Sequence, residues 1–531
     1  MLIEHETRYR SAMHSALQSL LLPIILSTLG CSTMPRGSDS PKTPSFALER
    51  PQDTRLGQRF LVASERHQDE SGYHIINSGI DGFVTRMQMI DAADRTIDMQ
   101  YFIFRGDKTG LLIAEALERA ADRGVRVRIL VDDGDTVAGD QKILALGRKP
   151  NIEVRIFNPF DYRGHNALLR HLDFVIHKGR LDYRMHNKLM VVDNSVALVG
   201  GRNIGAQYFQ VEPDSQFADD DAFAAGAIAA KLSKTFDSYW NSEFAVPSTS
   251  LPLPKERSAE AKVSFADGGM DYRTRIASGQ PLQDLIADDA ALDWAKATVV
   301  CDSPDKKDVE QRKKRGRLMA PEVTQAMHAA DSELLMVTPY FVPSESEIAL
   351  LGELRQRNTK VRILSNSLES APTLSAQSGY NKFRIRLLES GAQLYEVRAL
   401  LSSNRGSGQT RAISRYGTYG LHAKLYVMDR EHLYIGSMNY DQRSWRINTE
   451  VGLLIENRDL AEEVARRFDA MVSPEAAYQV FLDTDGKGRP HLRWTTEIDH
   501  REIELTREPS RGFWQRTQVE VLQLLPLDRE L

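Results

Sequence analysis

Two nine-residue segments of this chain follow one pattern, and their repetition constrains the fold more than any other feature of the sequence. Residues 185–193 read MHNKLMVVD and residues 421–429 read LHAKLYVMD. Each segment places a histidine two positions before a lysine, at the start of an apolar run that predicts a strand. A glycine-containing turn and an asparagine follow at the same distance in both segments. The two histidines lie 236 residues apart, so we expect two copies of one structural unit.

The sequence around these segments repeats as well. Residues 96–104 and 125–131 predict strands, and the apolar spacing of residues 111–123 predicts a helix between them. Residues 334–342 and 360–364 restate the two strands in the second half of the chain. A strand, a helix and a strand in this order predict a βαβ unit with a largely parallel sheet. The repeat is too long for a solenoid, so two homologous α/β domains packed as pseudo-twins are expected.

The length of 531 residues allows two to four domains. A polar stretch around residues 247–264 separates the two copies of the pattern. The expected division is a leader at 1–31, a disordered linker at 32–55, a first domain at 56–250, a linker that leads into the second half at 251–300, and a second domain with a C-terminal tail at 301–531.

The charge and the cysteine count argue against several classes of function. The net charge is −5 and the isoelectric point is about 6.3, whereas a nucleic-acid-binding protein usually carries a basic excess. Nucleic acid is therefore not expected as a partner. Two cysteines, Cys31 and Cys301, do not suffice for a disulfide framework or a thiolate zinc site. No metal or cofactor is expected, because the lysine beside each repeated histidine would repel a cation.

The N-terminus has the composition of a targeting signal. Arg8 and Arg10 precede an apolar run at residues 16–29, which is too short to span a bilayer but fits the apolar region of a secretory signal. Gly30 and Cys31 follow, and this order resembles the cleavage site of a bacterial lipoprotein with Cys31 as the lipidated residue. A plain signal or a disordered leader are the alternatives. We expect a membrane-associated bacterial protein, a lipoprotein on the periplasmic side, and leave inner and outer membrane open.

The two histidine–lysine pairs are the candidate catalytic groups. On a strand, residues two apart share a face, so His186 and Lys188 point the same way, and so do His422 and Lys424. One neutral histidine can attack phosphorus while a protonated one donates to the leaving oxygen, and two such histidines titrate as a coupled pair. Metal-free phosphodiester exchange also needs donors that stabilise negative charge. The expected donors are Lys188, Lys424, Asn203 and Asn439.

Each imidazole benefits from a carboxylate that fixes its tautomer. We assign this role to Asp221 and Glu450, each of which precedes a strand-like apolar run, and hold Asp219 in reserve. Asp193 and Asp429 lie an odd number of residues after their histidines, hence on the other face of a regular strand. They are expected to be structural and to cap the turn before the next strand.

The sequence resembles the phospholipase D superfamily, whose signature is HxKxxxxD followed by GSxN. Within it, the chain is similar to the C-type branch of bacterial cardiolipin synthases. The resemblance covers about residues 56–531. The segments that carry it are FNPF at 157–160, RMHNKLMVVD, GGRNIG, FADDDAFAAG, SYWNS and GSMNYDQRSWRINTE.

The resemblance implies two phospholipase D-type α/β domains, each a mixed sheet flanked by helices, related by a pseudo-twofold axis, with the site at their interface. It also implies a membrane-associated phosphatidyltransferase that forms cardiolipin from phosphatidylglycerol and a second phospholipid. The reaction would pass through a phosphohistidine at His186, with His422 as the acid and base. The first copy departs from the signature, because Gly201 stands where the superfamily has serine.

Two other functions remain open at the level of sequence. The same site with water as acceptor would be a phospholipase D or a nuclease, and a chain with an inactive site would be a lipid-binding scaffold. Phospholipids and the membrane are the expected partners. An accessory protein, the donor headgroup and the oligomeric state stay open.

Two further segments combine apolar and polar residues. Residues 165–178 place three histidines among leucine, valine and isoleucine, which predicts an amphipathic connecting segment, with a lipid-facing role as the alternative. Residues 511–531 predict a tail that packs against the second domain, with a membrane interface as the alternative.

Overall fold

The computed structural model describes residues 34–525, except for residues 36, 69, 135–143, 165, 211–214, 253–281, 283–284, 287–290 and 400–417. The leader, with Cys31, lies outside the described residues, so the prediction that Cys31 is lipidated stays a prediction. Among the described residues, no helix combines the length and the apolar character that crossing a membrane requires.

The first half of the chain is built on a mixed sheet whose strands hydrogen-bond in the order β4–β3–β2–β5–β6–β8–β1. Strands β2, β3 and β4 are parallel, and β5, β6, β8 and β1 continue the sheet in antiparallel fashion. The bounds are β1 (Ser71–Ile76), β2 (Thr96–Tyr101), β3 (Arg126–Asp132), β4 (Ile152–Phe157), β5 (Lys188–Val192), β6 (Val196–Gly200) and β8 (Asp221–Ala225).

The second half repeats this order as β14–β13–β11–β16–β17–β19–β10. Its parallel and antiparallel pairs match those of the first half one by one, which confirms the predicted pair of homologous α/β domains. The bounds are β10 (Asp293–Cys301), β11 (Glu333–Val337), β13 (Lys360–Asn366), β14 (Gln393–Val397), β16 (Leu425–Met428), β17 (His432–Gly436) and β19 (Val451–Glu456).

The two sheets join into one. Strand β1 pairs with the start of β10, whose remainder pairs with β19, so the described strands form a continuous 18-stranded sheet. Strands β9 (Ala245–Pro247), β20 (Ala477–Thr484), β21 (Pro490–Ile498) and β22 (Arg501–Leu505) extend its two edges. Two short pairs lie apart from it: β7 (Ser215–Ala218) with β15 (Thr418–Leu421), and β12 (Phe341–Val342) with β18 (Tyr440–Asp441).

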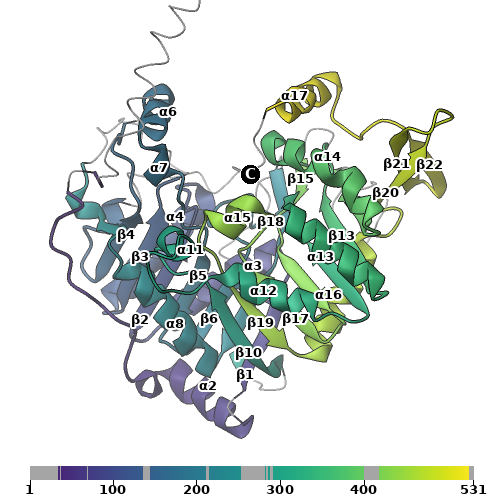
Figure 1. The fold of residues 1–531 in the computed structure, drawn as a ribbon. Helices are drawn as coiled ribbons and strands as arrows, with labels where there is room; N and C mark the ends of the chain where they lie inside the picture. The colour runs from purple at the N-terminus through teal and green to yellow at the C-terminus, as the bar shows by residue number, and fades with distance from the viewer. Residues whose placement is uncertain are drawn as a thin grey trace, which may run out of the picture.

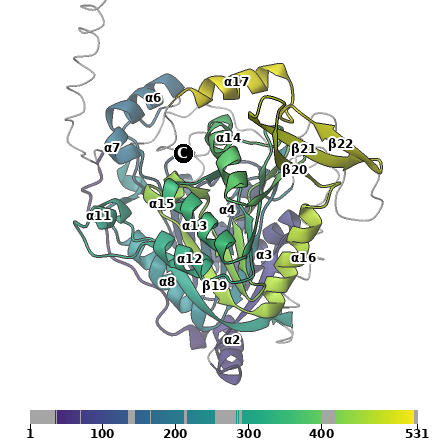
Figure 2. The same ribbon diagram turned by 45° about the vertical axis from the view of Figure 1, so that its right-hand side comes forward.

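Helices flank the sheet in both halves (Figures 1 and 2). They begin where the sequence offers a cap: Asp107 accepts from the backbone amides of Thr109 and Gly110 at the start of α4, and Asn457 does the same for Leu460 in α16. The flanking helices are α3 (Gly79–Ala92), α4 (Lys108–Asp122), α8 (Ala227–Trp240), α12 (Met319–His328), α13 (Glu345–Gln356), α14 (Leu374–Glu389) and α16 (Arg458–Met471).

The other helices among the described residues lie outside these layers or between the halves. They are α2 (Arg55–Arg66), α6 (Ala167–Ile176), α7 (Lys178–Leu181), α11 (Lys306–Glu310), α15 (Gln442–Arg446) and α17 (Phe513–Gln523), with short 3-10 turns at η2 (Pro51–Asp53) and η3 (Ser248–Ser250).

The hydrophobic core is continuous across the two halves. One buried cluster contains Val191 and Leu232 from the first half together with Leu335 and Leu453 from the second. Each half has a further cluster of its own on the opposite face of its sheet. Because the halves share a core, the groups at their boundary are held in fixed register.

The segment before α2 corrects one prediction. Part of the expected disordered linker at 32–55 is held against the first half: the Lys42 ammonium donates to the Ala245 carbonyl at 3.0 Å, and the Ala47 amide donates to Asp237 at 2.8 Å. The Ser45 carbonyl accepts from the buried guanidinium of Arg128 at 2.7 Å. A buried guanidinium requires acceptors for all its donors, and the segment supplies one of them.

Candidate active site

The two repeated histidines lie at the boundary between the halves, and each is fixed by the backbone of the other half. The His186 amide, just before β5, donates to the Thr449 carbonyl at 2.9 Å. The His422 amide, just before β16, donates to the Ala218 carbonyl at 2.8 Å. Both residues are 7% exposed. The site is therefore assembled only when both halves are in place.

The two lysines are buried beside the histidines. The Lys188 ammonium donates to the His186 carbonyl at 2.6 Å, and the Lys424 ammonium donates to the His422 carbonyl. Burial lowers the pKa of Lys188 well below its ordinary value, with a further contribution from the nearby Lys424. Burial also lowers the pKa of Lys424 to about 8. Two buried ammonium groups this close together favour an anion between them.

Each imidazole contacts a carboxylate that comes from the other half. His186 Nδ1 lies 2.9 Å from Glu450 Oε2, and His422 Nδ1 lies 2.6 Å from Asp219 Oδ2. Glu450 directly precedes β19, and Asp219 lies in the short connection from β7 to β8. With Nδ1 facing a carboxylate, Nε2 is the nitrogen left to each imidazole for chemistry.

Asp221, which the sequence assigned to an imidazole, does not reach one. Its carboxylate lies 2.9 Å from the Arg86 guanidinium and 3.1 Å from that of Arg202, all three side chains being buried. The strand pairing shows which residues of the two halves correspond. Gly200 pairs with Asp221 in the first half, and the equivalent Gly436 pairs with Gly452 in the second, so Asp221 corresponds to Gly452. This register makes Asp219 the counterpart of Glu450. The assignment of Asp221 is wrong, and the reserve residue Asp219 occupies the position.

The two carboxylates differ in charge. Burial raises the pKa of Glu450 to about 7, against the opposing effect of Lys188. Burial also acts to raise the pKa of Asp219, but His422, Lys424 and Arg202 outweigh it and lower that pKa to about 2. Asp219 is therefore ionised at neutral pH, whereas Glu450 is close to its titration midpoint.

Both imidazoles favour the neutral form in this site. Burial and the two lysines lower the pKa of His186 well below its ordinary value. Burial and Lys424 lower the pKa of His422 to about 3, although Asp219 opposes them. The direction follows from low polarity and from the positive charge nearby.

The turn residues before the carboxylates explain why the first copy lacks the signature serine. Ser437 Oγ donates to Glu450 Oε2 at 2.6 Å. At Gly201, a Cβ atom would lie 2.0 Å from Asp219 Oδ1. The shorter aspartate occupies the space that a serine side chain would need, so Gly201 and Asp219 form one matched pair and Ser437 and Glu450 form the other.

Both predicted asparagines are buried at the site. Asn203 Oδ1 accepts from the Ile103 amide at 3.2 Å, which leaves its amide nitrogen for other partners. Asn439 is 5% exposed, and among the described residues its Oδ1 has no hydrogen-bond partner. This oxygen can only accept a hydrogen bond, so the NH2 group of Asn439 is the part of its amide that can donate to a phosphoryl oxygen.

Asp193 and Asp429 lie in the turns that follow β5 and β16, with φ of 51° and 54°. Their carboxylates accept from backbone amides that precede or begin a neighbouring strand: Asp193 from residues 94–96, and Asp429 from residues 331–333. These two residues fasten the sheet, as structural residues would, although the amides that they bind lie at the starts of β2 and β11 and not in the turn before the next strand.

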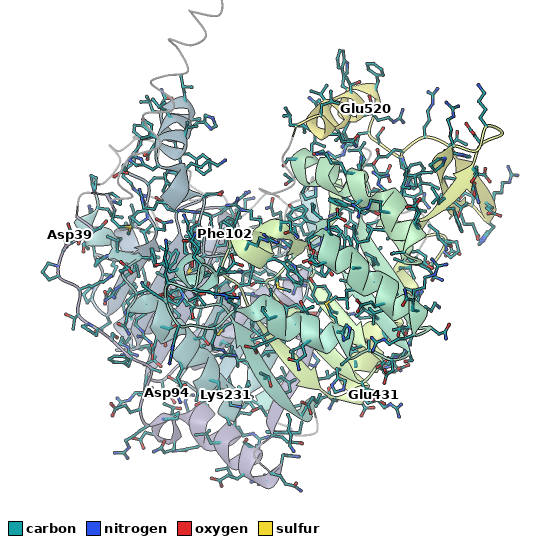
Figure 3. All side chains as sticks on the ribbon, in the orientation of Figure 1. Asp39, Asp94, Phe102, Lys231, Glu431 and Glu520 are labelled. Carbon is teal, nitrogen blue, oxygen red and sulfur yellow. The ribbon has the colours of Figure 1, made fainter. Side chains whose placement is uncertain are left out.

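Aromatic rings beside the imidazoles were not anticipated from the sequence. The Phe102 ring centroid lies 5.0 Å from that of His186, and the rings of Tyr208 and Phe217 lie 5.1 and 5.3 Å from that of His422. Figure 3 shows Phe102 between the two halves. Only the tertiary structure brings these residues to the site, because their spacing in sequence has no pattern.

A family model described as cardiolipin synthase, PLD-like domain, matches residues 87–240 and again residues 323–472. The chain belongs to this family. It is a cardiolipin synthase-like enzyme of the phospholipase D superfamily, and each matched range contains one histidine–lysine pair.

Individual relatives agree with this membership. The chain is 33% identical to cardiolipin synthase C of Escherichia coli strain K12, over 89% of this chain and 99% of that protein. It is 24% identical to the major cardiolipin synthase ClsA of Bacillus subtilis strain 168, over 78% of this chain and 72% of that one. The crystal structure of phosphatidylserine synthase from Haemophilus influenzae shares the fold, with a TM-score of 0.51 and 13% identity over 79% of this chain and 91% of that one.

Proposed function

We propose that this enzyme transfers a phosphatidyl group from one phospholipid to phosphatidylglycerol and so forms cardiolipin, through a covalent phosphohistidine. The crossed histidine–carboxylate pairs are the observation that carries the proposal. They provide two imidazoles whose Nδ1 atoms face carboxylates, two buried ammonium groups and two asparagines within one anion-attracting site. The cardiolipin synthases that are 33% and 24% identical to the chain supply the substrate class.

In the first step, His186 is the nucleophile. Its Nδ1–H donates to Glu450, and its neutral Nε2 attacks the phosphorus of the donor phospholipid. The bond from phosphorus to the headgroup alcohol breaks, and His422 gives that oxygen a proton. The ammonium groups of Lys188 and Lys424, with the amides of Asn203 and Asn439, stabilise the charge on the phosphoryl oxygens.

In the second step, His422 is the base. Now neutral, it takes the proton from a hydroxyl of phosphatidylglycerol, whose oxygen attacks the phosphohistidine. The P–N bond to His186 breaks, His186 returns to the neutral form, and cardiolipin leaves. His422 is protonated again and ready for the next donor.

His422 is the better acid because of its partner. The ionised Asp219 stabilises an imidazolium directly, whereas Glu450 carries less charge near neutral pH. Burial and the charge of Lys424 lower the pKa of His422. A bound phosphodiester offsets that positive charge and raises the pKa again, so protonation of His422 is linked to binding of the substrate.

A product assay tests the proposal. Full-chain protein is incubated with vesicles of phosphatidylglycerol and phosphatidylethanolamine, with the wild type, His186→Ala and His422→Ala side by side. We expect cardiolipin from the wild type alone. Phosphatidic acid in its place would mean that water is the acceptor and would overturn transfer. The absence of any product would overturn the assigned substrate class.

The intermediate is tested separately. A phospholipid labelled in its phosphoryl group is mixed with the enzyme, the reaction is stopped with denaturant at alkaline pH, and the labelled peptide is identified. We expect label on the peptide that contains His186. Label on His422 would reverse the two roles.

We further propose that Cys31 anchors the enzyme as a lipoprotein on the periplasmic side. Cells supplied with a labelled fatty acid are expected to incorporate label into the wild-type chain and not into Cys31→Ala. Equal label in both proteins would contradict the anchor.

A further inference from the structure

Exposed apolar side chains are concentrated on two helices. Of the thirteen large apolar residues that are exposed in the described part of the chain, ten lie on α6 and on α17 with the two residues after it. They are Leu168, Leu169, Leu172, Val175 and Ile176 on α6, and Phe513, Trp514, Val521, Leu524 and Leu525 at α17. Groups of exposed apolar side chains on a protein surface mark an interaction site.

Helix α6 has its polarity reversed. Its two charged residues, Arg170 and Asp173, are buried, while its leucine, valine and isoleucine side chains face outward. Asp173 accepts from the Tyr162 amide at 2.8 Å and contacts His177 at 2.7 Å, and Arg170 donates to the Asp133 carbonyl. The helix is thus fastened to the protein by its charges and presents its apolar face to the surroundings.

Helix α17 is fastened in a similar way. Val519 is buried against the second half, and the side chain of Gln515 donates to the Leu368 carbonyl at 2.7 Å. Trp514 is 75% exposed and Leu524 is 83% exposed. The sequence predicted a tail packed on the second domain, and the structure adds that its other face is apolar and uncovered by the described residues.

The two helices lie at the same end of the molecule, one on each half. Figures 1 and 2 show α6 and α17 together at this end and α2 at the opposite end. Helix α6 is followed by α7, and His186 comes five residues after the end of α7. Helix α17 contacts the loop at Leu368, and the nearby Asn366 bonds Leu421, the residue before His422.

We infer that α6 and α17 together form a membrane-docking surface that enters the interface of a phospholipid bilayer. Two separate patches, one on each half and each linked to one catalytic histidine, match a flat apolar layer that covers both at once. Exposed Lys178 and Arg511 lie at the ends of the two helices, where cations meet lipid phosphates. The inference goes beyond the proposed function, since docking does not depend on which product the enzyme forms.

Tryptophan fluorescence tests the inference on the full chain. Vesicles of phosphatidylglycerol and phosphatidylethanolamine carry either ordinary or brominated acyl chains. Trp514 emission is expected to fall by about twofold with the brominated lipid, because an interfacial helix lies about 5–10 Å into the headgroup and acyl boundary. The quenched component is expected to disappear in Trp514→Phe, which keeps the apolar character. His186→Ala is expected to be quenched like the wild type.

A matched pair of variants tests α6. In the Trp514→Phe background, Leu172→Trp is expected to restore quenching, whereas Val62→Trp is not. Leu172 and Val62 are 52% and 44% exposed, and Val62 lies on α2 at the opposite end (Figure 1). Any membrane anchor in the leader is common to all variants and cannot produce this difference.

The possible results distinguish a bilayer from a second copy of the chain as the partner of this surface. Quenching at both Trp514 and position 172, with none at position 62, supports docking even if no cardiolipin is formed. Equal emission in ordinary and brominated vesicles at both helices overturns it. In that case, a dimer in velocity sedimentation that Leu172→Ser and Leu524→Ser dissociate would identify the face as an interface between copies of the chain.

Discussion

The two halves of the active site have the same parts but different electrostatics. In one, His186 contacts Glu450, whose pKa is raised to about 7 by burial and which accepts from Ser437. In the other, His422 contacts Asp219, whose pKa is lowered to about 2 and which lies against Gly201. A duplicated site need not be a symmetric one.

This difference suggests how one motif serves two roles. A neutral imidazole that donates to a weakly charged partner is a nucleophile, and an imidazole beside a full negative charge can hold a proton. The carboxylates cross between the halves, so neither half contains a complete histidine–carboxylate pair. The asymmetry and the crossing can each be tested.

The largest expected effect separates the two histidines. His186→Ala is expected to lower turnover by about 10⁴-fold or more and to abolish the covalent adduct, the range seen when a nucleophile is removed. His422→Ala is expected to lose turnover on phospholipids but still form the adduct with a nitrophenyl phosphodiester, whose leaving group needs no acid. Rapid-quench assays with that substrate measure both. An adduct in His186→Ala but not in His422→Ala would mean that His422 is the nucleophile and His186 the acid and base.

The carboxylates are expected to differ next. Asp219→Asn should lower kcat by about 10³-fold, because the charge that holds the proton on His422 is gone. Glu450→Gln should lower it by about 10- to 100-fold, since an amide oxygen still accepts from the neutral His186. Steady-state kinetics on mixed vesicles measures both values. If the two variants were equally impaired, the two sites would be equivalent and the proposed division of roles would fail.

Asp221 provides the structural contrast to Asp219. Asp221→Asn removes the carboxylate between the buried guanidiniums of Arg86 and Arg202, and is expected to lower the free energy of unfolding by about 3 kcal/mol. Urea denaturation measures this. The kcat of the protein that remains folded should stay near that of the wild type, the reverse of Asp219→Asn. If Asp221→Asn had normal stability but no activity, Asp221 would have a catalytic role after all.

The turn residues sharpen the comparison further. Gly201→Ala places a Cβ 2.0 Å from Asp219 Oδ1, so the carboxylate must move from His422, and we expect a loss of about 100-fold in kcat. Ser437→Ala removes one hydrogen bond from Glu450 and is expected to cost about 10-fold. Thermal unfolding serves as the control for both. An active Gly201→Ala would show that the close packing against Asp219 is dispensable.

The smallest effect concerns pH. Lys424 is protonated below its pKa of about 8 and loses its charge above it. The kcat/KM, which reports the free enzyme, should therefore fall by a further factor of about ten per pH unit above about pH 8, beyond any change caused by His422 and Glu450 at lower pH. Lys424→Arg keeps its charge and should lose this alkaline limb while retaining part of the activity. A limb that persists in Lys424→Arg would assign the titration to another group.

Most of the fold could be predicted from the repeated motif. Two copies of HxK in front of an apolar run, with strands and helices at constant offset, predicted homologous α/β domains, and the matching strand orders confirm them. The linker at 32–55 was misjudged because its ordering depends on Arg128 and Asp237, which lie far away in the chain. A polar segment without periodicity carries no signal of distant partners.

The choice between Asp219 and Asp221 could not be made from sequence spacing. Asn203 precedes Asp219 by sixteen residues, whereas Asn439 precedes Glu450 by eleven, so counting from the motif does not align the carboxylates. Three consecutive aspartates at 219–221 offered no distinction by type. Only the pairing of Gly200 with Asp221 and of Gly436 with Gly452 fixed the correspondence.

The sequence by itself determined the duplication, the strands that bear the histidines and lysines, and the family, because these depend on local periodicity and on residues close together in the chain. The tertiary structure alone decided which carboxylate meets which imidazole, why Gly201 is not a serine, and where α6 and α17 present their apolar faces. Those features depend on contacts between halves more than 200 residues apart. Contacts of that kind follow from the packing of the whole chain, and a local pattern cannot encode them.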